Sequence, residues 1–148
     1  MIRIDNLSKH YKSLKAVDGL SLHVKPGELF AFLGPNGAGK TTTIRIMTGL
    51  TRRTSGTVTL NNIEVGPKSV TARKQCGLVP QSINLDRELS VYENLTIHGR
   101  LFRMGRTERK QRIDELLDYV EMGDRKESLV KNLSGGMKRR VMIARALM

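Results

Sequence analysis

Hydrophobic and polar residues alternate in two stretches of the first part of the chain, which predicts strands there. Three apolar residues are separated by polar neighbours in the first stretch: Leu20, Leu22 and Val24. Pro26-Gly27 predicts the turn that ends this strand. The second strand is expected over Thr57–Leu60, and Asn61-Asn62 predicts a turn into a further strand.

Two continuous apolar runs indicate strands of another kind. Leu29–Leu33 is too short for a helix and lies between Gly27 and Gly34. Such a run is typical of a strand that is buried on both faces, as in a parallel sheet. Cys76–Val79 is a last short run, and Pro80 would end it because proline cannot donate to a strand ladder.

After Pro80 the apolar spacing becomes helical, so we expect a strand-rich part over residues 1–82 and a helical part over residues 83–148. Ser90 and Glu93 stand three residues apart, as in a capping box, where each side chain bonds to the other residue's backbone N–H. This box predicts the start of a helix, and Gly105 is the residue expected to close it.

Two further helices are expected from their caps and apolar faces. Thr107 is expected to cap a helix that Gly123 ends, with one apolar face: Ile113, Leu116, Leu117 and Val120. Ser134 is expected to cap the other, whose apolar positions also recur at helical spacing: Met137, Val141, Ala144 and Met148.

The composition is that of a soluble globular protein, with 39% hydrophobic and 27% charged residues among 148. No apolar run approaches the ~18 residues that a membrane span needs. The first residues lack the apolar core of a secretion signal. Cys76 is the single cysteine, which excludes an internal disulfide. These features together indicate the cytosol.

The net charge of +12 suggests nucleic-acid binding until the charges are located. Most of the excess lies in two windows, residues 100–112 and 131–145. A nucleic-acid binder more often places aromatic residues among the basic ones, but aromatics are 4% here and tryptophan is absent. We therefore expect no nucleic-acid partner and interpret both windows as solvated helix faces. The alternative is that some of these arginines lie near anionic lipid headgroups or an acidic protein partner.

The segment Gly34–Thr41 carries the clearest chemistry, because it matches the complete phosphate-binding pattern GxxxxGK[ST]. It follows an apolar run and precedes a helical segment, as this mechanism requires. The glycines allow the backbone N–H groups to point at phosphate oxygens, and the following helix start adds positive potential. Lys40 would bridge the β- and γ-phosphates, and the Thr41 hydroxyl would ligate Mg²⁺.

Leu133–Met137, with the sequence LSGGM, resembles the signature motif of ATP-binding cassette (ABC) transporters, and Ser134 stands 94 residues after Lys40. Gln81 resembles the glutamine of that family's Q-loop, and Tyr11 resembles the aromatic residue that stacks on adenine. The resemblance covers the whole chain. It is strongest to the exporter branch that includes antibiotic-resistance and nodulation-factor pumps.

This resemblance implies an α/β fold, with a P-loop NTPase core, an antiparallel N-terminal β part and a helical subdomain, incomplete at the C-terminus. The cofactors implied are ATP and Mg²⁺. Gln81 and Ser134 would be catalytic, and Thr41 and Gln81 would hold the metal. The residues that would bind the nucleotide are Tyr11, Gly34, Asn36, Gly37, Gly39, Lys40, Thr41, Thr42, Ser134, Gly135 and Gly136.

The resemblance also implies two partners, a second ATP-binding subunit and a membrane-spanning permease, at the cytoplasmic face of the membrane. In this family the Mg²⁺ carboxylate, the catalytic glutamate and the switch histidine follow the signature helix, and the 148 residues contain none of them. Leu116-Leu117-Asp118 is no substitute, because its spacing is helical. We therefore expect an incomplete domain that does not hydrolyse ATP alone.

We interpret the chain as part of an ABC exporter's ATP-binding subunit, which couples ATP hydrolysis to transport. The first alternative is a soluble ABC ATPase that acts on ribosomes or DNA. The second is a P-loop kinase or another small nucleotide enzyme, which has no reason to carry LSGGM.

Overall fold

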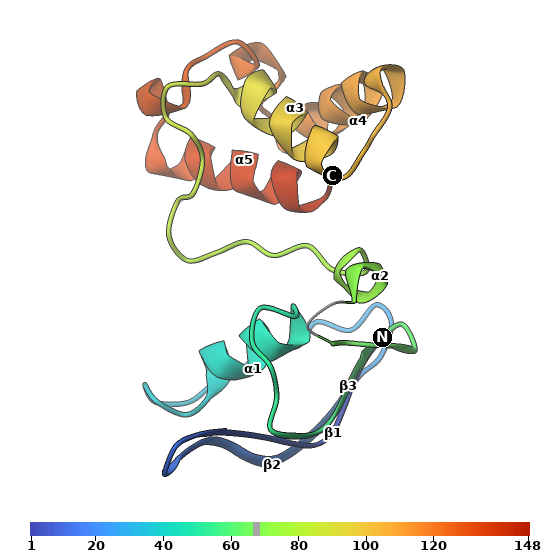
Figure 1. Cartoon of the computed structure of the whole chain (residues 1–148). Coiled ribbons are helices and arrows are strands. Elements are labelled where there is room, and N and C mark those ends of the chain that lie inside the picture. Colours follow the sequence, from blue (N-terminus) through green and yellow to red (C-terminus); the bar gives the residue numbers. More distant parts are fainter. Residues whose placement is uncertain (67–68) are drawn as a thin grey trace. The chain divides into compact units, whose positions relative to one another are not determined.

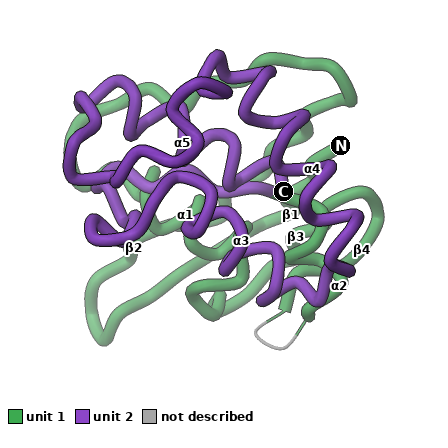
Figure 2. Tube along the Cα trace, turned by 90° about the horizontal axis from the view of Figure 1, so that it is seen from above, with its two compact units in different colours: residues 1–76 green, residues 77–148 purple. Residues whose placement is uncertain are grey.

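The computed structural model describes residues 1–66 and 69–148 and divides the chain into two compact units (Figure 2). Unit 1 spans Met1–Cys76 and unit 2 spans Gly77–Met148. The division therefore lies a few residues before residue 82, where the apolar spacing changes.

Unit 1 contains a four-stranded antiparallel sheet with the strand order β2-β1-β3-β4 (Figure 1). Its strands are β1 (Ile2–Tyr11), β2 (Leu14–Val24), β3 (Ser55–Leu60) and β4 (Ile63–Glu64). The alternation expected at residues 20–24 is confirmed, because Leu20, Leu22 and Val24 are at least partly buried and the residues between them are exposed. The turn at Asn61-Asn62 also joins β3 to β4, as expected.

Two helices supply side chains to the core of unit 1. They are α1 (Lys40–Met47) and α2 (Val70–Arg73). Ile46 from α1 and Ala72 from α2 are buried with residues of the sheet: Ile4, Leu7, Val17, Val58 and Leu60. This packing fixes α1, and the glycine loop before it, against the sheet.

The strands expected at Leu29–Leu33 and Cys76–Val79 are absent from the structure. Leu29 is 98% exposed and Leu33 is 91% exposed, so the first run is not buried on either face. A strand needs a neighbour that accepts and donates its backbone hydrogen bonds, and apolar character does not supply one. In the described parts of the chain, neither run pairs with another segment.

Unit 2 is built from three helices around a separate core. They are α3 (Val91–Leu101), α4 (Arg106–Tyr119) and α5 (Gly135–Ala146), with short 3₁₀ turns η1 (Gly123–Arg125) and η2 (Val130–Asn132) between the last two. The core holds the expected apolar face of α4 and two members of that of α5: Ile113, Leu116, Leu117, Val120, Val141 and Ala144. Leu116-Leu117-Asp118 is helical, as expected.

Two of the expected helix starts are confirmed. Ser90 and Glu93 form the complete capping box of α3, and the Ser134 hydroxyl accepts a hydrogen bond from the Met137 N–H at 3.2 Å. The prediction that Thr107 caps α4 was wrong. Gly105 precedes this helix, and the Glu108 carboxylate accepts its N–H at 3.3 Å, so the helix begins before Thr107.

Both predicted glycine stops in unit 2 were wrong. Helix α3 ends at Leu101, and two residues later Arg103 takes a left-handed conformation with φ of 61°. Helix α4 ends at Tyr119, and two residues later Glu121 takes the same left-handed conformation with φ of 55°. In each case a longer side chain occupies the left-handed position that glycine most often takes, two residues before Gly105 and Gly123.

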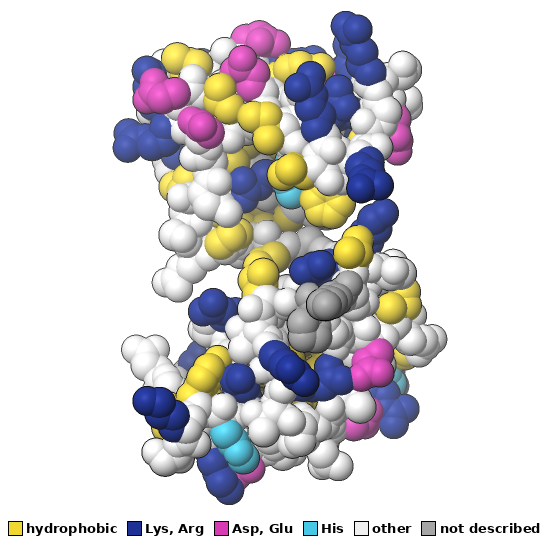
Figure 3. All heavy atoms as spheres, viewed as in Figure 1, with side chains coloured by type: hydrophobic (Ala, Val, Ile, Leu, Met, Phe, Trp, Pro, Cys, Tyr) yellow, Lys and Arg dark blue, Asp and Glu magenta, His cyan; other side chains and the backbone are white. Residues whose placement is uncertain are grey.

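The surface is rich in basic side chains, and Figure 3 shows Lys and Arg spread over the visible face of each unit. Among the described residues, no helix has the length and apolar character needed to cross a membrane.

Candidate nucleotide-binding site

The Gly34–Thr41 loop curls through three glycines with positive φ before α1 begins at Lys40. The φ values are 150° at Gly34, 86° at Gly37 and 80° at Gly39. The expected helix after the loop is therefore confirmed, and its first turn presents the backbone N–H groups that have no partner inside a helix. Such groups form a binding site for an anion.

Gly39 is the position where the loop requires a residue without a side chain. A Cβ atom at Gly39 would lie 2.4 Å from the Ala16 carbonyl oxygen and 3.2 Å from a methyl group of Val17. Because of these contacts and the left-handed φ, any residue other than glycine would be strained at this position. Strand β2 therefore fixes the start of α1, which the spacing of the motif does not reveal.

The Lys40 ammonium group lies on its own loop. Its Nζ donates hydrogen bonds to the carbonyl oxygens of Gly34 and Pro35, both at 2.6 Å. Thr41 is exposed, and its hydroxyl has no hydrogen-bond partner in the described residues. Thr42 is partly buried beside it, and Asn36 is exposed in the turn. The loop thus places the Lys40 ammonium and the exposed Thr41 hydroxyl at a helix start.

A hollow of about 390 Å³ lies beside this loop. Strand β2 contributes residues that the sequence gave no reason to select, including Lys15 and Asp18. They come from a segment that precedes the motif by some twenty residues, and only the packing of β2 brings them there. The other lining residues are Ala16, Val17, Leu20, Phe32, Leu33, Gly37, Ala38, Lys40 and Thr43.

Tyr11 belongs to the same unit but does not line this hollow. It is the last residue of β1, where it pairs with Leu14, and it is 46% exposed. The Lys9 Nζ lies 4.5 Å from the centroid of its ring, within the range of a cation–π contact. The Tyr11 ring is thus accessible to solvent, and the Lys9 ammonium group lies over one of its faces.

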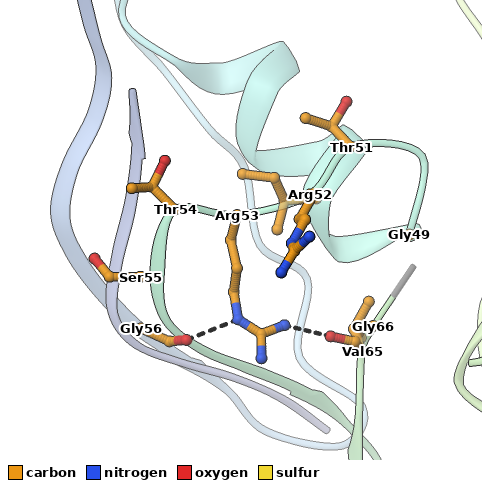
Figure 4. Close-up of a pocket in the computed structure, with 10 residues that line it drawn as sticks. Gly49, Thr51, Arg52, Arg53, Thr54, Ser55, Gly56, Val65 and Gly66 are labelled. Atoms are coloured by element: carbon orange, nitrogen blue, oxygen red, sulfur yellow. Dashed lines mark hydrogen bonds between the residues drawn. The ribbon is translucent and has the colours of Figure 1, made fainter. Parts of the chain in front are cut away.

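A second hollow, of about 280 Å³, lies at the C-terminal end of α1 (Figure 4). Arg53 crosses it, donating to the Gly56 carbonyl at 2.7 Å and to the Val65 carbonyl, and it also pairs with Glu64. The hydrogen-bonding groups of Arg53 therefore join the segment after α1 to the edge of the sheet. We assign this arginine to the fold.

The signature-like residues lie at the start of α5 in unit 2. Ser134, Gly135 and Gly136 are all exposed, and Ser134 is the N-cap. A Cβ atom at Gly135 would meet nothing within 4 Å, and one at Gly136 would meet only the Ser134 hydroxyl, at 4.0 Å. No contact among the described residues requires glycine at Gly135, although glycine weakens a helix.

Gln81 lies in unit 2 with Ser134, whereas Tyr11 and Lys40 lie in unit 1. The Gln81 side chain is exposed and makes no hydrogen bond within the described residues. Its backbone carbonyl accepts a hydrogen bond from Arg139 at 2.7 Å. Sequence reasoning did not select Arg139, because the contact joins residues 58 positions apart.

Two other titratable groups lie outside these motifs. Burial raises the pKa of the Cys76 thiol, which packs against the core of unit 1. The raised pKa favours the unreactive thiol form. Burial, followed by the nearby charge of Arg145, lowers the pKa of His98. The His98 ring packs against Phe102 with 4.9 Å between ring centroids.

Comparison with known proteins identifies the class. The sequence pattern of the ABC transporter family matches residues 17–148. The chain is 44% identical over 147 residues to the Nod factor export ATP-binding protein I of Cupriavidus metallidurans, covering 99% of this chain and 48% of that protein. It is 40% identical over 148 residues to the linearmycin resistance ATP-binding protein LnrL of Bacillus subtilis, covering 100% and 48%.

A solved structure shows the same fold. The dimeric, post-hydrolysis state of the ATP-binding cassette MJ0796, bound to ADP and Pi, has a TM-score of 0.81 and 31% identity, over 99% of this chain and 69% of that chain. The chain belongs to the ABC transporter family. It spans 48% of the length of the curated relatives named above. The α/β fold expected from the resemblance is confirmed.

Proposed function

We propose that the chain provides the ATP-binding part of an ABC exporter subunit, and that the Gly34–Thr41 loop binds the phosphates. The observation that carries this proposal is the geometry of the loop: positive-φ glycines lead directly into the first turn of α1 at Lys40. The related cassette MJ0796, which binds ADP and Pi, supports the same ligand class. On binding, the Lys40 ammonium would exchange its two loop carbonyls for phosphate oxygens.

The exposed Thr41 hydroxyl fits a Mg²⁺ ligand, because it is a hard oxygen donor with no partner among the described residues. Gln81 would supply a second oxygen, from its free side-chain amide. Mg²⁺ would neutralise charge on the phosphates. Asn36 and Thr42 would complete the loop, and the accessible Tyr11 ring would stack on adenine.

Ser134, Gly135 and Gly136 would meet the nucleotide held by a second copy of the subunit. The exposed helix start supports this role, because a Cβ atom at Gly135 would meet none of the described residues within 4 Å. A small residue at this position would let the nucleotide of the second copy approach the helix start. The dimeric state of MJ0796 supports a paired arrangement.

Hydrolysis and transport are proposed for the full-length protein. The Nod factor export and linearmycin resistance relatives support an exporter at the cytoplasmic face of a membrane, where a permease would be the partner. Part of the helical unit would face that permease. The 148 residues by themselves would not turn over ATP.

The test compares Lys40→Ala with Ser134→Asp in the full-length protein. Aspartate remains a good N-cap, so Ser134→Asp keeps α5 intact but sets a negative charge where a γ-phosphate would lie. We expect Lys40→Ala to weaken ATP binding by the monomer about tenfold or more. Ser134→Asp should leave monomer binding within about twofold and abolish turnover, because it affects only the paired state.

Lys25→Ala is the matched control for the lost charge, since Lys25 lies in the exposed turn after β2. Equal loss of monomer ATP binding in Lys40→Ala and Ser134→Asp would contradict the assignment of the two motifs. Titration with a fluorescent ATP analogue and a phosphate-release assay measure the two quantities.

A further inference from the structure

The segment 77–84, which contains Gln81, has little of its own to hold it in place. It forms no helix or strand, and none of its backbone groups bonds to another backbone group in the described residues. Its apolar side chains Leu78, Val79 and Ile83 are each more than one third exposed. Its position must therefore come from other contacts.

Those contacts come from α5, beside which the segment runs in Figure 1. Arg139 donates from its two terminal nitrogens to the carbonyl oxygens of Pro80, at 2.5 Å, and Gln81, at 2.7 Å. Arg145 donates to the Asn84 carbonyl at 3.0 Å and to the Asn84 side chain. Two arginines of one helix thus hold the segment on either side of Gln81 and at its carbonyl.

The backbone also approaches α5 directly at Gly77. A Cβ atom there would lie 2.1 Å from the Ala146 carbonyl oxygen, so only glycine allows this approach. The segment is therefore anchored to the end of α5 at Gly77 and to its first half at Arg139. A guanidinium group has fixed, planar donors, so a bidentate contact sets orientation as well as distance.

We propose that Arg139 is a positioning residue that holds Gln81 in register with the helix that Ser134 begins. This inference rests on the proposed roles of Gln81 and Ser134. Ser134 and Arg139 lie five residues apart on the same helix start, and a helix moves as one piece. Any shift of the Ser134 tip would then carry the Gln81 backbone with it through the two carbonyl contacts.

The test is a double-mutant cycle in the full-length protein, with steady-state ATP hydrolysis as the readout. Arg139→Met keeps the side-chain length and removes the donors. We expect kcat to fall about tenfold, because the loop loses its orientation, while KM for ATP stays within about twofold. Arg139→Lys should recover part of kcat, since an ammonium group reaches the carbonyls without the planar fork.

The decisive comparison uses a Gln81→Ala background, in which Arg139→Met should lower kcat no further. An equal loss in both backgrounds would show that Arg139 acts elsewhere and would overturn the inference. The same holds if Gln81→Ala lowers kcat and Arg139→Met does not. Normal turnover in Gln81→Ala would instead remove the proposed role of Gln81, and the inference with it.

Limited proteolysis with thermolysin, which cleaves before accessible apolar residues, supplies a readout that is independent of activity. Arg139→Met should speed cleavage at Leu78, Val79 and Ile83 and leave cleavage within α3 and α4 unchanged. Arg140→Met is the matched control, because Arg140 bonds to Val120 and Glu121 instead of to this segment. Equal cleavage rates within residues 78–84 in Arg139→Met and the unmodified protein would contradict the proposed clamp.

Discussion

Gly135 is a residue whose identity the chain's own packing does not explain. It stands at the first position of α5, its φ is not in the left-handed region, and a Cβ atom would touch nothing. Alanine would suit an isolated helix better at this position. This glycine is therefore a suitable position at which to test the proposed contact with a second copy of the subunit.

Gly135→Ala should therefore separate stability from function. We expect a gain of roughly 0.5 kcal/mol in the free energy of unfolding, because alanine loses less backbone entropy than glycine. ATP turnover of the full-length protein should fall about tenfold, because the added methyl group would keep the start of α5 away from the nucleotide that we propose is held by a second copy. Chemical denaturation and phosphate release measure the two effects.

Gly105→Ala is the matched control, since a Cβ atom there makes an ordinary contact, at 3.8 Å from Glu108, before the exposed first turn of α4. It should leave turnover unchanged. Unchanged turnover in Gly135→Ala as well would remove the argument for an external partner at this helix.

At the scale of elements, α3 is tied to the segment before it by one buried amide. The Asn94 oxygen accepts the Asp86 N–H at 2.9 Å, and its nitrogen donates to the carbonyls of Asp86 and Ser90, both at 3.0 Å. The capping box of Ser90 and Glu93, which begins α3, lies at the end of this segment. The amide thus closes the loop that leads from the Gln81 segment into the helical core.

Asn94→Ala should lower the free energy of unfolding by about 2 kcal/mol. The change removes the side-chain amide that bonds to the Asp86 N–H and to the carbonyls of Asp86 and Ser90. Thr96→Val is a contrasting change on the same helix. The buried Thr96 hydroxyl has no partner among the described residues, so valine should be neutral or stabilising. Urea denaturation measures both, and an equal effect of the two changes would contradict this account.

At the scale of the whole molecule, the two units carry separate hydrophobic cores. Leu95 is fully buried in unit 2 with residues of α4 and α5. Ile4 is 1% exposed in unit 1 with residues of β2, β3 and α1. No described residue belongs to both cores.

Leu95→Ala should therefore destabilise unit 2 selectively, by roughly 2–5 kcal/mol, because it leaves a cavity in that core. Hydrogen exchange should speed up in α3, α4 and α5, while the amides of β1 and β3 keep their protection. Ile4→Ala should give the reverse pattern. A uniform loss of protection from either change would show that the two units unfold as one.

Sequence reasoning predicted several features that depend on neighbours along the chain, although the cap at Thr107 and the helix ends at Gly105 and Gly123 were wrong. The caps at Ser90 and Ser134, the alternating residues of β2 and the helix after the glycine loop follow from short-range hydrogen bonds and spacing, and all are present. The roles of the candidate residues stay predictions, from Tyr11 to Gly136. The contribution of β2 to the hollow beside the loop had no signal in the sequence, because it depends on packing.

The sequence by itself determined the phosphate-binding pattern and the starts of α3 and α5, because a cap or a loop is specified by residues within one turn of each other. Only the tertiary structure decided that Leu29–Leu33 forms no strand in the part described, that Ala16 lies against Gly39, and that Arg139 donates to the Gln81 carbonyl. These outcomes depend on which distant segment supplies a hydrogen-bond partner or fills the space, and a local pattern contains no information about that choice.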